Sequence, residues 1–143
     1  MLKVDHTYRI KRSAEQEEQM KYLTELKVFQ SYAHILTASA IIGYANHASS
    51  PVSKNASDGV LMQFFSEKDY DLFHLLAYAT KKEQSVLTAE GNEKYNIFEE
   101  YAHAGFPILV AKLGVDFDDK SKNNRLEIMR RYYTMLLTKD IYA

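Results

Sequence analysis

The sequence predicts an all-α fold: a compact single-domain bundle of about five helices around a central apolar helix at residues ~29–47. No Asp, Glu, Lys or Arg lies between Lys27 and Lys54, although 26% of all residues are charged. A helix without charge over this length is covered on nearly all sides. Only two prolines and five glycines among 143 residues favour long helices and few turns. This length corresponds to one domain.

The helix boundaries follow from capping residues. Ser13 with Gln16 three residues later predicts the start of a first helix, which lies at the surface because its apolar positions are sparse. Ser66 with Asp69 predicts a third helix in the same way. The fourth is expected from Gly91 or Asn92 to Leu113 with Gly114 at its end, and the last is expected to begin at Ser121. In the central helix, we expect Ile41 in the core, where aspartate would cost more than ~3 kcal/mol.

Two local features leave the pattern less regular. The apolar run at 59–65, GVLMQFF, fits a short buried strand or a helical turn, and we favour the turn because no partner strand is visible. Pro107 lies inside the fourth helix, where it removes the hydrogen bond to the His103 carbonyl. With Gly105 nearby, a kink is expected at this point.

Composition excludes several classes of function. The absence of cysteine excludes disulfides, thiolate zinc sites and a cysteine nucleophile. A formal charge of −1 provides no global basic field of the kind typical of nucleic-acid binders. The amino terminus lacks the pattern of a signal peptide, and no apolar run approaches the ~20 residues that span a bilayer. We therefore expect a cytoplasmic protein with no membrane contact, whose residues 1–12 form a basic and mobile segment.

Two helical pairs have the spacing of metal ligands. Asp71 and His74 are three residues apart, as are Glu100 and His103, so each pair shares a helix face. Di-iron bundles use two Glu-x-x-His pairs and a carboxylate from each of two further helices. The central helix offers no carboxylate, and one pair has Asp in place of Glu. We expect no metal and no cofactor, and keep a metal-dependent factor using these four residues as an alternative.

Positive charge is concentrated in two short segments. One lies near the amino terminus and the other between residues 120 and 131, and either could contact phosphates. A DNA-binding regulator that uses residues 120–131 is therefore a second alternative. The nucleic-acid candidates are Arg9, Lys11, Arg12, Lys122, Arg125 and Arg130.

The last helix has too many apolar positions for one core face. At 100° per residue, Leu126, Met129, Tyr133, Leu136 and Leu137 form one stripe, and other apolar residues widen it to roughly 200°. We assign Ile128, Tyr132 and Met135 to the excess side, as candidates for contact with a second copy or with another protein.

Four stretches of the chain resemble a known family. They are the basic start YRIKR, the segment FQSYAHILTASAIIGYANH followed by a loop and Pro51, and FSEKDYDLFHLLAYATKKEQSVL with EEYAHAGFPIL downstream. Together they are similar to the Dnd-system-associated protein 4 family, small proteins encoded with bacterial DNA phosphorothioation gene clusters. The resemblance covers roughly residues 8–113 and includes no catalytic signature.

The resemblance implies a setting rather than a reaction. Proteins of such clusters replace a non-bridging phosphate oxygen of DNA with sulfur, or cut DNA that lacks the mark, in antiviral defence against phages. A small member without a catalytic motif is expected to be a non-enzymatic accessory, adaptor or regulatory subunit. Its partners would be proteins of the same gene cluster, with a homo-oligomer and a direct DNA contact left open.

Overall fold

The computed structural model describes residues 2–52, 58–88 and 91–143, and this part of the chain is mostly helical. The predicted all-α class is confirmed, with the addition of a two-stranded sheet of two residues per strand. In chain order the elements are β1 (Arg9–Ile10), α1 (Ala14–Glu25), α2 (Tyr32–Ala45), β2 (Val60–Leu61), a 3₁₀ turn (Met62–Phe64), α3 (Glu67–Lys81), α4 (Ser85–Thr88), α5 (Glu93–Leu113), a second 3₁₀ turn (Lys120–Lys122) and α6 (Arg125–Thr138).

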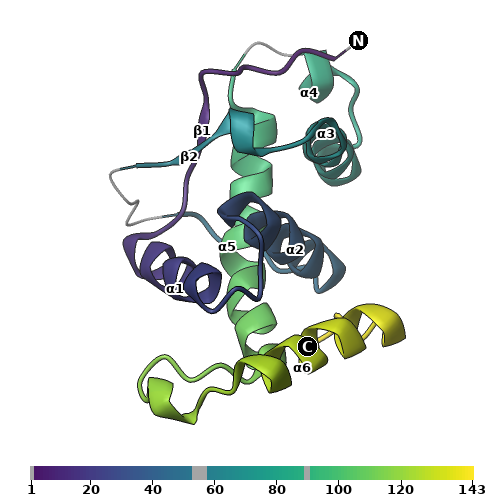
Figure 1. Cartoon of the computed structure of the whole chain (residues 1–143). Helices are drawn as coiled ribbons and strands as arrows, with labels where there is room; N and C mark the ends of the chain where they lie inside the picture. The colour runs from purple at the N-terminus through teal and green to yellow at the C-terminus, as the bar shows by residue number, and fades with distance from the viewer. Residues whose placement is uncertain (1, 53–57, 89–90) are drawn as a thin grey trace.

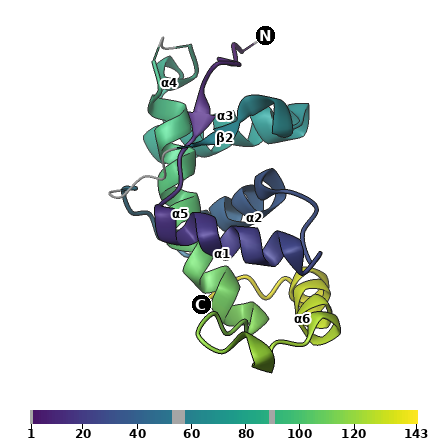
Figure 2. The ribbon, with the colours of Figure 1, turned by 60° about the vertical axis from the view of Figure 1, so that its left-hand side comes forward.

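The longest helix, α5, is the axis of the molecule. Its 21 residues extend over about 32 Å. Figure 1 shows α3, α2 and α6 crossing α5 at successive levels, and Figure 2 shows the same arrangement from another side. The apolar helix predicted at 29–47 is observed as α2, which packs against α5 and has half of its residues buried. The centre of the fold is therefore the α2–α5 pair.

Glycines bring α2 and α5 into backbone contact. A Cβ atom on Gly105 of α5 would lie 1.8 Å from the Ser39 carbonyl oxygen of α2. A Cβ atom on Gly43 of α2 would lie 2.2 Å from the Tyr101 carbonyl oxygen of α5. No side chain fits at either position, so each glycine allows an approach that even alanine would prevent.

Most predicted helix ends are confirmed, but the central helix begins at Tyr32, after the Ser31 cap, rather than at about Phe29. The Ser13 hydroxyl accepts a hydrogen bond from the Gln16 amide at 3.1 Å, and Ser66 and Asp69 form a reciprocal capping box. Gly114 ends α5 with φ 67°. However, α6 begins after Asn124 rather than Ser121, because Asn124 Oδ1 caps the Glu127 amide at 3.0 Å.

The segment at 59–65 is only partly helical. Residues 60 and 61 form β2, antiparallel to β1, and the 3₁₀ turn follows directly. Arg9 pairs with Leu61 and Ile10 with Val60. The helical turn that we favoured is therefore wrong for residues 60 and 61. The prediction failed because the partner strand, β1, is too short to show an alternating pattern in the sequence.

The amino-terminal segment, predicted to be mobile, is packed along α5. Polar side chains of α5 form hydrogen bonds with the backbone of this segment and with the side chain of Tyr8. Lys94 Nζ donates to the Lys3 carbonyl (2.6 Å), the Asp5 amide donates to Tyr95 Oη (2.7 Å), and Tyr8 Oη donates to Glu99 Oε2 (2.8 Å).

Helix α5 continues through Pro107, and α1 binds the carbonyl group that the proline leaves without a hydrogen-bond donor. Pro107 has no N–H, so the carbonyl of His103 lacks its partner within the helix. The side-chain amide of Gln16, which is buried, donates to this carbonyl at 2.9 Å. Met20 and Leu23 are fully buried beside it. The predicted surface helix is thus attached to the core through one apolar face and one polar contact.

Two neighbouring isoleucines of α2 provide a matched test of this core. Ile41, which we expected to be buried, is 45% exposed, whereas Ile42 is 1% exposed. Ile42→Asp is expected to lower the free energy of unfolding by more than about 3 kcal/mol, because it leaves an unpaired buried charge. Ile41→Asp is expected to change it by less than about 1 kcal/mol. Urea denaturation of both variants measures the difference; equal losses would contradict the observed orientation of α2.

The glycine contact is tested by Gly105→Ala. Alanine is favoured over glycine inside a helix by about 1 kcal/mol, but its methyl group here would overlap the backbone of α2. Overpacking of this kind costs about 1–3 kcal/mol or more. The melting temperature is therefore expected to fall, while Ala111→Ser at an exposed position of α5 serves as a control. A raised melting temperature would show that α2 and α5 can separate without cost.

Candidate protein-interaction surface

Helix α6 has two apolar faces that point in roughly opposite directions. At 100° per residue, Ile128, Tyr132 and Met135 lie on one side and Leu126 and Leu137 on the other. The first three side chains are buried in the core of the chain itself, at 1%, 5% and 5% exposure. Our assignment of these three residues to a partner interface is therefore wrong.

Tyr132 is held particularly firmly in the buried face. Its hydroxyl is hydrogen-bonded to His34 Nε2 of α2 at 3.0 Å. Its ring lies 4.8 Å from the ring of Phe29 in an edge-to-face arrangement. Burial raises the pKa of the Tyr132 hydroxyl and lowers that of His34, so both groups are neutral at pH 7. The buried face fixes how α6 is oriented.

Large apolar side chains lie in solvent on the side opposite to the core and extend around the helix to Leu136, which is next to Tyr132. We call this surface the exposed face of α6 and define it by four residues. A run of such residues along one helix is unusual for a monomer and is typical of a binding surface. The face consists of Leu126 (71% exposed), Tyr133 (53%), Leu136 (48%) and Leu137 (83%).

Two arginines of α6 attach it to the ends of other helices. Arg125 Nε donates to the Leu26 carbonyl at the end of α1 at 2.7 Å. Arg131 Nη1 donates to the Leu113 carbonyl at the end of α5 at 3.1 Å. Cations at helix carboxyl ends are favourable because carbonyl groups are unpaired there. These contacts hold the exposed face in a fixed position.

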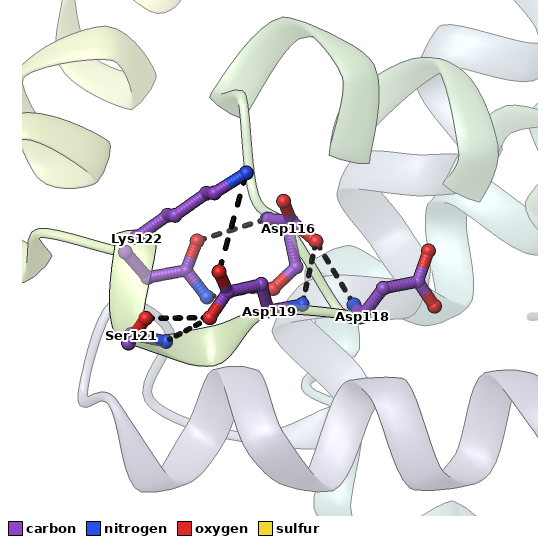
Figure 3. Close-up of polar contacts among 6 residues, drawn as sticks. Asp116, Asp118, Asp119, Ser121 and Lys122 are labelled. Atoms are coloured by element: carbon purple, nitrogen blue, oxygen red, sulfur yellow. Dashed lines mark hydrogen bonds and ion pairs between the residues drawn. The ribbon is translucent and has the colours of Figure 1, made fainter.

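The acidic loop before α6 is bonded within itself. Asp116 Oδ1 accepts hydrogen bonds from the amides of Asp118 and Asp119, both at 2.9 Å (Figure 3). Asp119 in turn accepts from Ser121 and lies 4.0 Å from the ammonium of Lys122 (Figure 3). The loop therefore builds the turn into α6, and its carboxylates are used for that purpose.

Of the six basic residues proposed for nucleic acid, one is buried and two are engaged within the chain. Arg12 is 6% exposed and lies over the Tyr32 ring at 4.2 Å, so it is not available to phosphate. Arg125 and Arg130 have partners in the chain, at the end of α1 and at Glu127 respectively. The side chains that remain exposed are Arg9, Lys11, Lys122, Arg125 and Arg130.

The two predicted metal pairs lie at different levels of α5. His74 Nε2 lies 3.3 Å from Lys94 Nζ, while Glu100 and His103 are on α5 itself. His103 follows Lys94 by nine positions, which correspond to about 14 Å along the helix. Within the described residues, no three histidine or carboxylate side chains gather as metal ligands do. The four residues are therefore not brought together.

Sequence reasoning missed a group of buried polar side chains on α5. Lys94, Tyr95 and Glu99 are at most 5% exposed. Burial raises the pKa of the Glu99 carboxyl to about 7, although Lys11 and Tyr8 hydrogen bonds oppose this. Burial also lowers the pKa of Lys94 and of His74 beside it. No motif marks these residues; their only signal is charge on a helix that is otherwise largely apolar.

The fold and the surface define a small helical protein whose last helix is apolar on both sides. A family model described as DNA sulphur modification system-associated protein 4 matches residues 9–136. The match covers most of the chain, so the protein belongs to this family, as the resemblance predicted, and the match includes most of α6. No curated protein and no solved structure matches significantly. Among the described residues, no helix is long and apolar enough to cross a membrane.

The buried carboxyl of Glu99 gives a testable pH dependence. Its pKa in the folded protein is about 7, above the ordinary 4.5. The protonated form therefore stabilises the fold fully below pH 4.5, and this stabilisation is lost as the pH rises through about 7. At 1.36 kcal/mol per unit, the loss is on the order of 3 kcal/mol.

Glu99→Gln removes this dependence while keeping an oxygen that can accept from Tyr8. The buried His74 and the half-buried His34 and His103, whose lowered pKa values act in the opposite direction, are present in both proteins. Urea denaturation between pH 5 and pH 8 is expected to show the variant gaining stability relative to the natural protein as the pH rises. Parallel pH profiles would mean that Glu99 ionises with an ordinary pKa.

Proposed function

We propose that this protein is a non-enzymatic accessory subunit of a cytoplasmic DNA sulphur modification system that serves in antiviral defence. In this proposal it acts as an adaptor and binds another protein of the system through the exposed face of α6. The family supports the setting. The four solvent-exposed apolar side chains of α6, opposite a face that the core already uses, support the mode of action.

The energetics favour a partner at this face. Fully burying an apolar side chain contributes about 1.5–3 kcal/mol before the costs of association are subtracted. Four such residues in one stripe are the usual arrangement for a helix that docks against a groove or a second helix. Because the arginine contacts already fix α6, little conformational entropy would be lost on binding.

A non-enzymatic role agrees with how the titratable groups are used. Glu99 and Lys94 bind the backbone of residues 3–11, and His34 binds Tyr132. The carboxylates of the loop at 116–119 close turns. Each of these groups therefore has a role in the fold, whereas the exposed face of α6, which includes the two most exposed leucines of the described residues, has none.

The test is a double substitution, Leu126→Glu with Leu137→Glu. Both side chains are exposed, so the variant is expected to keep its circular dichroism spectrum and its melting temperature within a few degrees. Co-expression with each other protein of the same system, followed by size-exclusion chromatography, is expected to show a complex for the natural protein and none for the variant.

Leu75→Glu is the matched control, because Leu75 is 65% exposed on α3. It is expected to leave the complex intact. The proposal is wrong if the natural protein forms no complex with any protein of the system, or if the double variant forms it with unchanged affinity. Sedimentation of the protein alone shows whether it associates with a second copy. Self-association through the exposed face of α6 would also contradict an adaptor role for this face.

A further inference from the structure

The exposed face of α6 is bordered on one side by a small basic cleft. The cleft has a volume of about 280 Å³ and lies where the end of α5 meets α6. Three of its lining residues are cations and two are threonines, with one acidic residue. It is lined by Lys112, Arg130, Arg131, Thr134, Met135, Thr138 and Asp140.

The cations of the cleft have more donors than the carboxylates nearby can accept. Lys112 Nζ donates to Asp140 Oδ1 at 3.1 Å, and Glu127 accepts from Arg130 and lies 3.4 Å from Arg131 Nε. Each arginine has five N–H donors and the lysine has three, so donors remain for a further anion. Counting Asp140 and Glu127, the group keeps one positive charge in excess.

The cleft is continuous with the exposed face. Arg130 follows Leu126 by four residues, and Leu137 lies seven residues after Arg130, so the three side chains lie along one edge of the helix. An occupant that covers the apolar stripe therefore places its own edge beside Arg130, the cation through which the stripe meets the cleft. Complementary charge at that edge would be attracted, and positive charge repelled.

We infer that the partner of α6 is a protein segment whose apolar stripe is bordered by acidic residues, and that one of its carboxylates enters the cleft. This inference rests on the proposed function and specifies the chemistry of the partner. A nucleic acid would also offer anions, but the leucines that border the cleft favour a protein, since duplex DNA presents phosphates and not an apolar stripe. Arginine and a neighbouring carboxylate form charge-assisted hydrogen bonds of fixed geometry.

Three labelled probes test the inference by fluorescence anisotropy. Two are 18-residue model helices with the same leucine stripe, one bordered by glutamates and the other by lysines. The third is a short DNA duplex. The natural protein is expected to bind the glutamate helix at least about tenfold more tightly than the lysine helix, since like charges at a rim repel.

The variant Lys112→Glu with Arg130→Glu is expected to reverse this preference. Lys21→Glu with Lys68→Glu, at exposed positions elsewhere, is the control of equal net charge. If the charge-reversed protein does not fold, Lys112→Gln with Arg130→Gln is expected to abolish the preference instead. Equal binding of both helices, binding of neither, or tighter binding of the duplex that is lost in the cleft variant would overturn the inference.

These outcomes are distinct from those that decide the proposed function. If Leu126→Glu with Leu137→Glu destroys the complex within the system while Lys112→Glu with Arg130→Glu leaves it intact, the adaptor role stands and the acidic partner does not. If neither pair affects the complex, both conclusions fail.

Discussion

The backbone contact between α2 and α5 determines where the other elements of this protein lie. Gly43 and Gly105 remove the two side chains that would keep the helices apart, and the carbonyl oxygens of Ser39 and Tyr101 occupy the space. Once α2 is fixed on α5, the amino-terminal segment and α3 both attach near Lys94 at the start of α5, α1 attaches at His103, and α6 attaches at the end of α5 (Figure 1). The orientation of α6, and with it the exposed face, follows from this arrangement because Tyr132 reaches back to His34 of α2.

Much of the fold could be predicted because its signals are local. The caps at Ser13 and Ser66 and the end at Gly114 depend on hydrogen bonds within four residues, and all three are observed. The β1–β2 pair could not be predicted, because two residues are too few to show an alternating pattern and the partner lies far away in the sequence. The start of α6 was misplaced since Ser121, Asn123 and Asn124 can each cap a helix; the Asn123 side chain is instead bonded to Asp116 and Tyr22, and Asn124 caps α6.

The candidate site was located on the correct helix but on the wrong side of it. Periodicity identifies two apolar stripes on α6, and it contains no information about which stripe faces the core. Leucines predominate on the side that is exposed, whereas the buried side includes a tyrosine, whose hydroxyl is acceptable inside only because His34 binds it. The partner of a buried polar group comes from elsewhere in the chain, and for the same reason the sequence did not reveal Glu99 or Lys94.

The hydrogen bond from Gln16 to the His103 carbonyl fixes the position of α1 on a surface of α5 that is otherwise apolar. Hydrophobic contacts through Met20 and Leu23 would tolerate sliding by one helical turn, since they depend on area and not on direction. Sliding would, however, break this partly buried hydrogen bond, which contributes about 0.5–1.5 kcal/mol. Pro107 thus determines the position of α1 along α5. It removes a hydrogen bond within α5, and the carbonyl that this leaves free binds α1 at one place. Its contribution is therefore to the uniqueness of the fold more than to its stability.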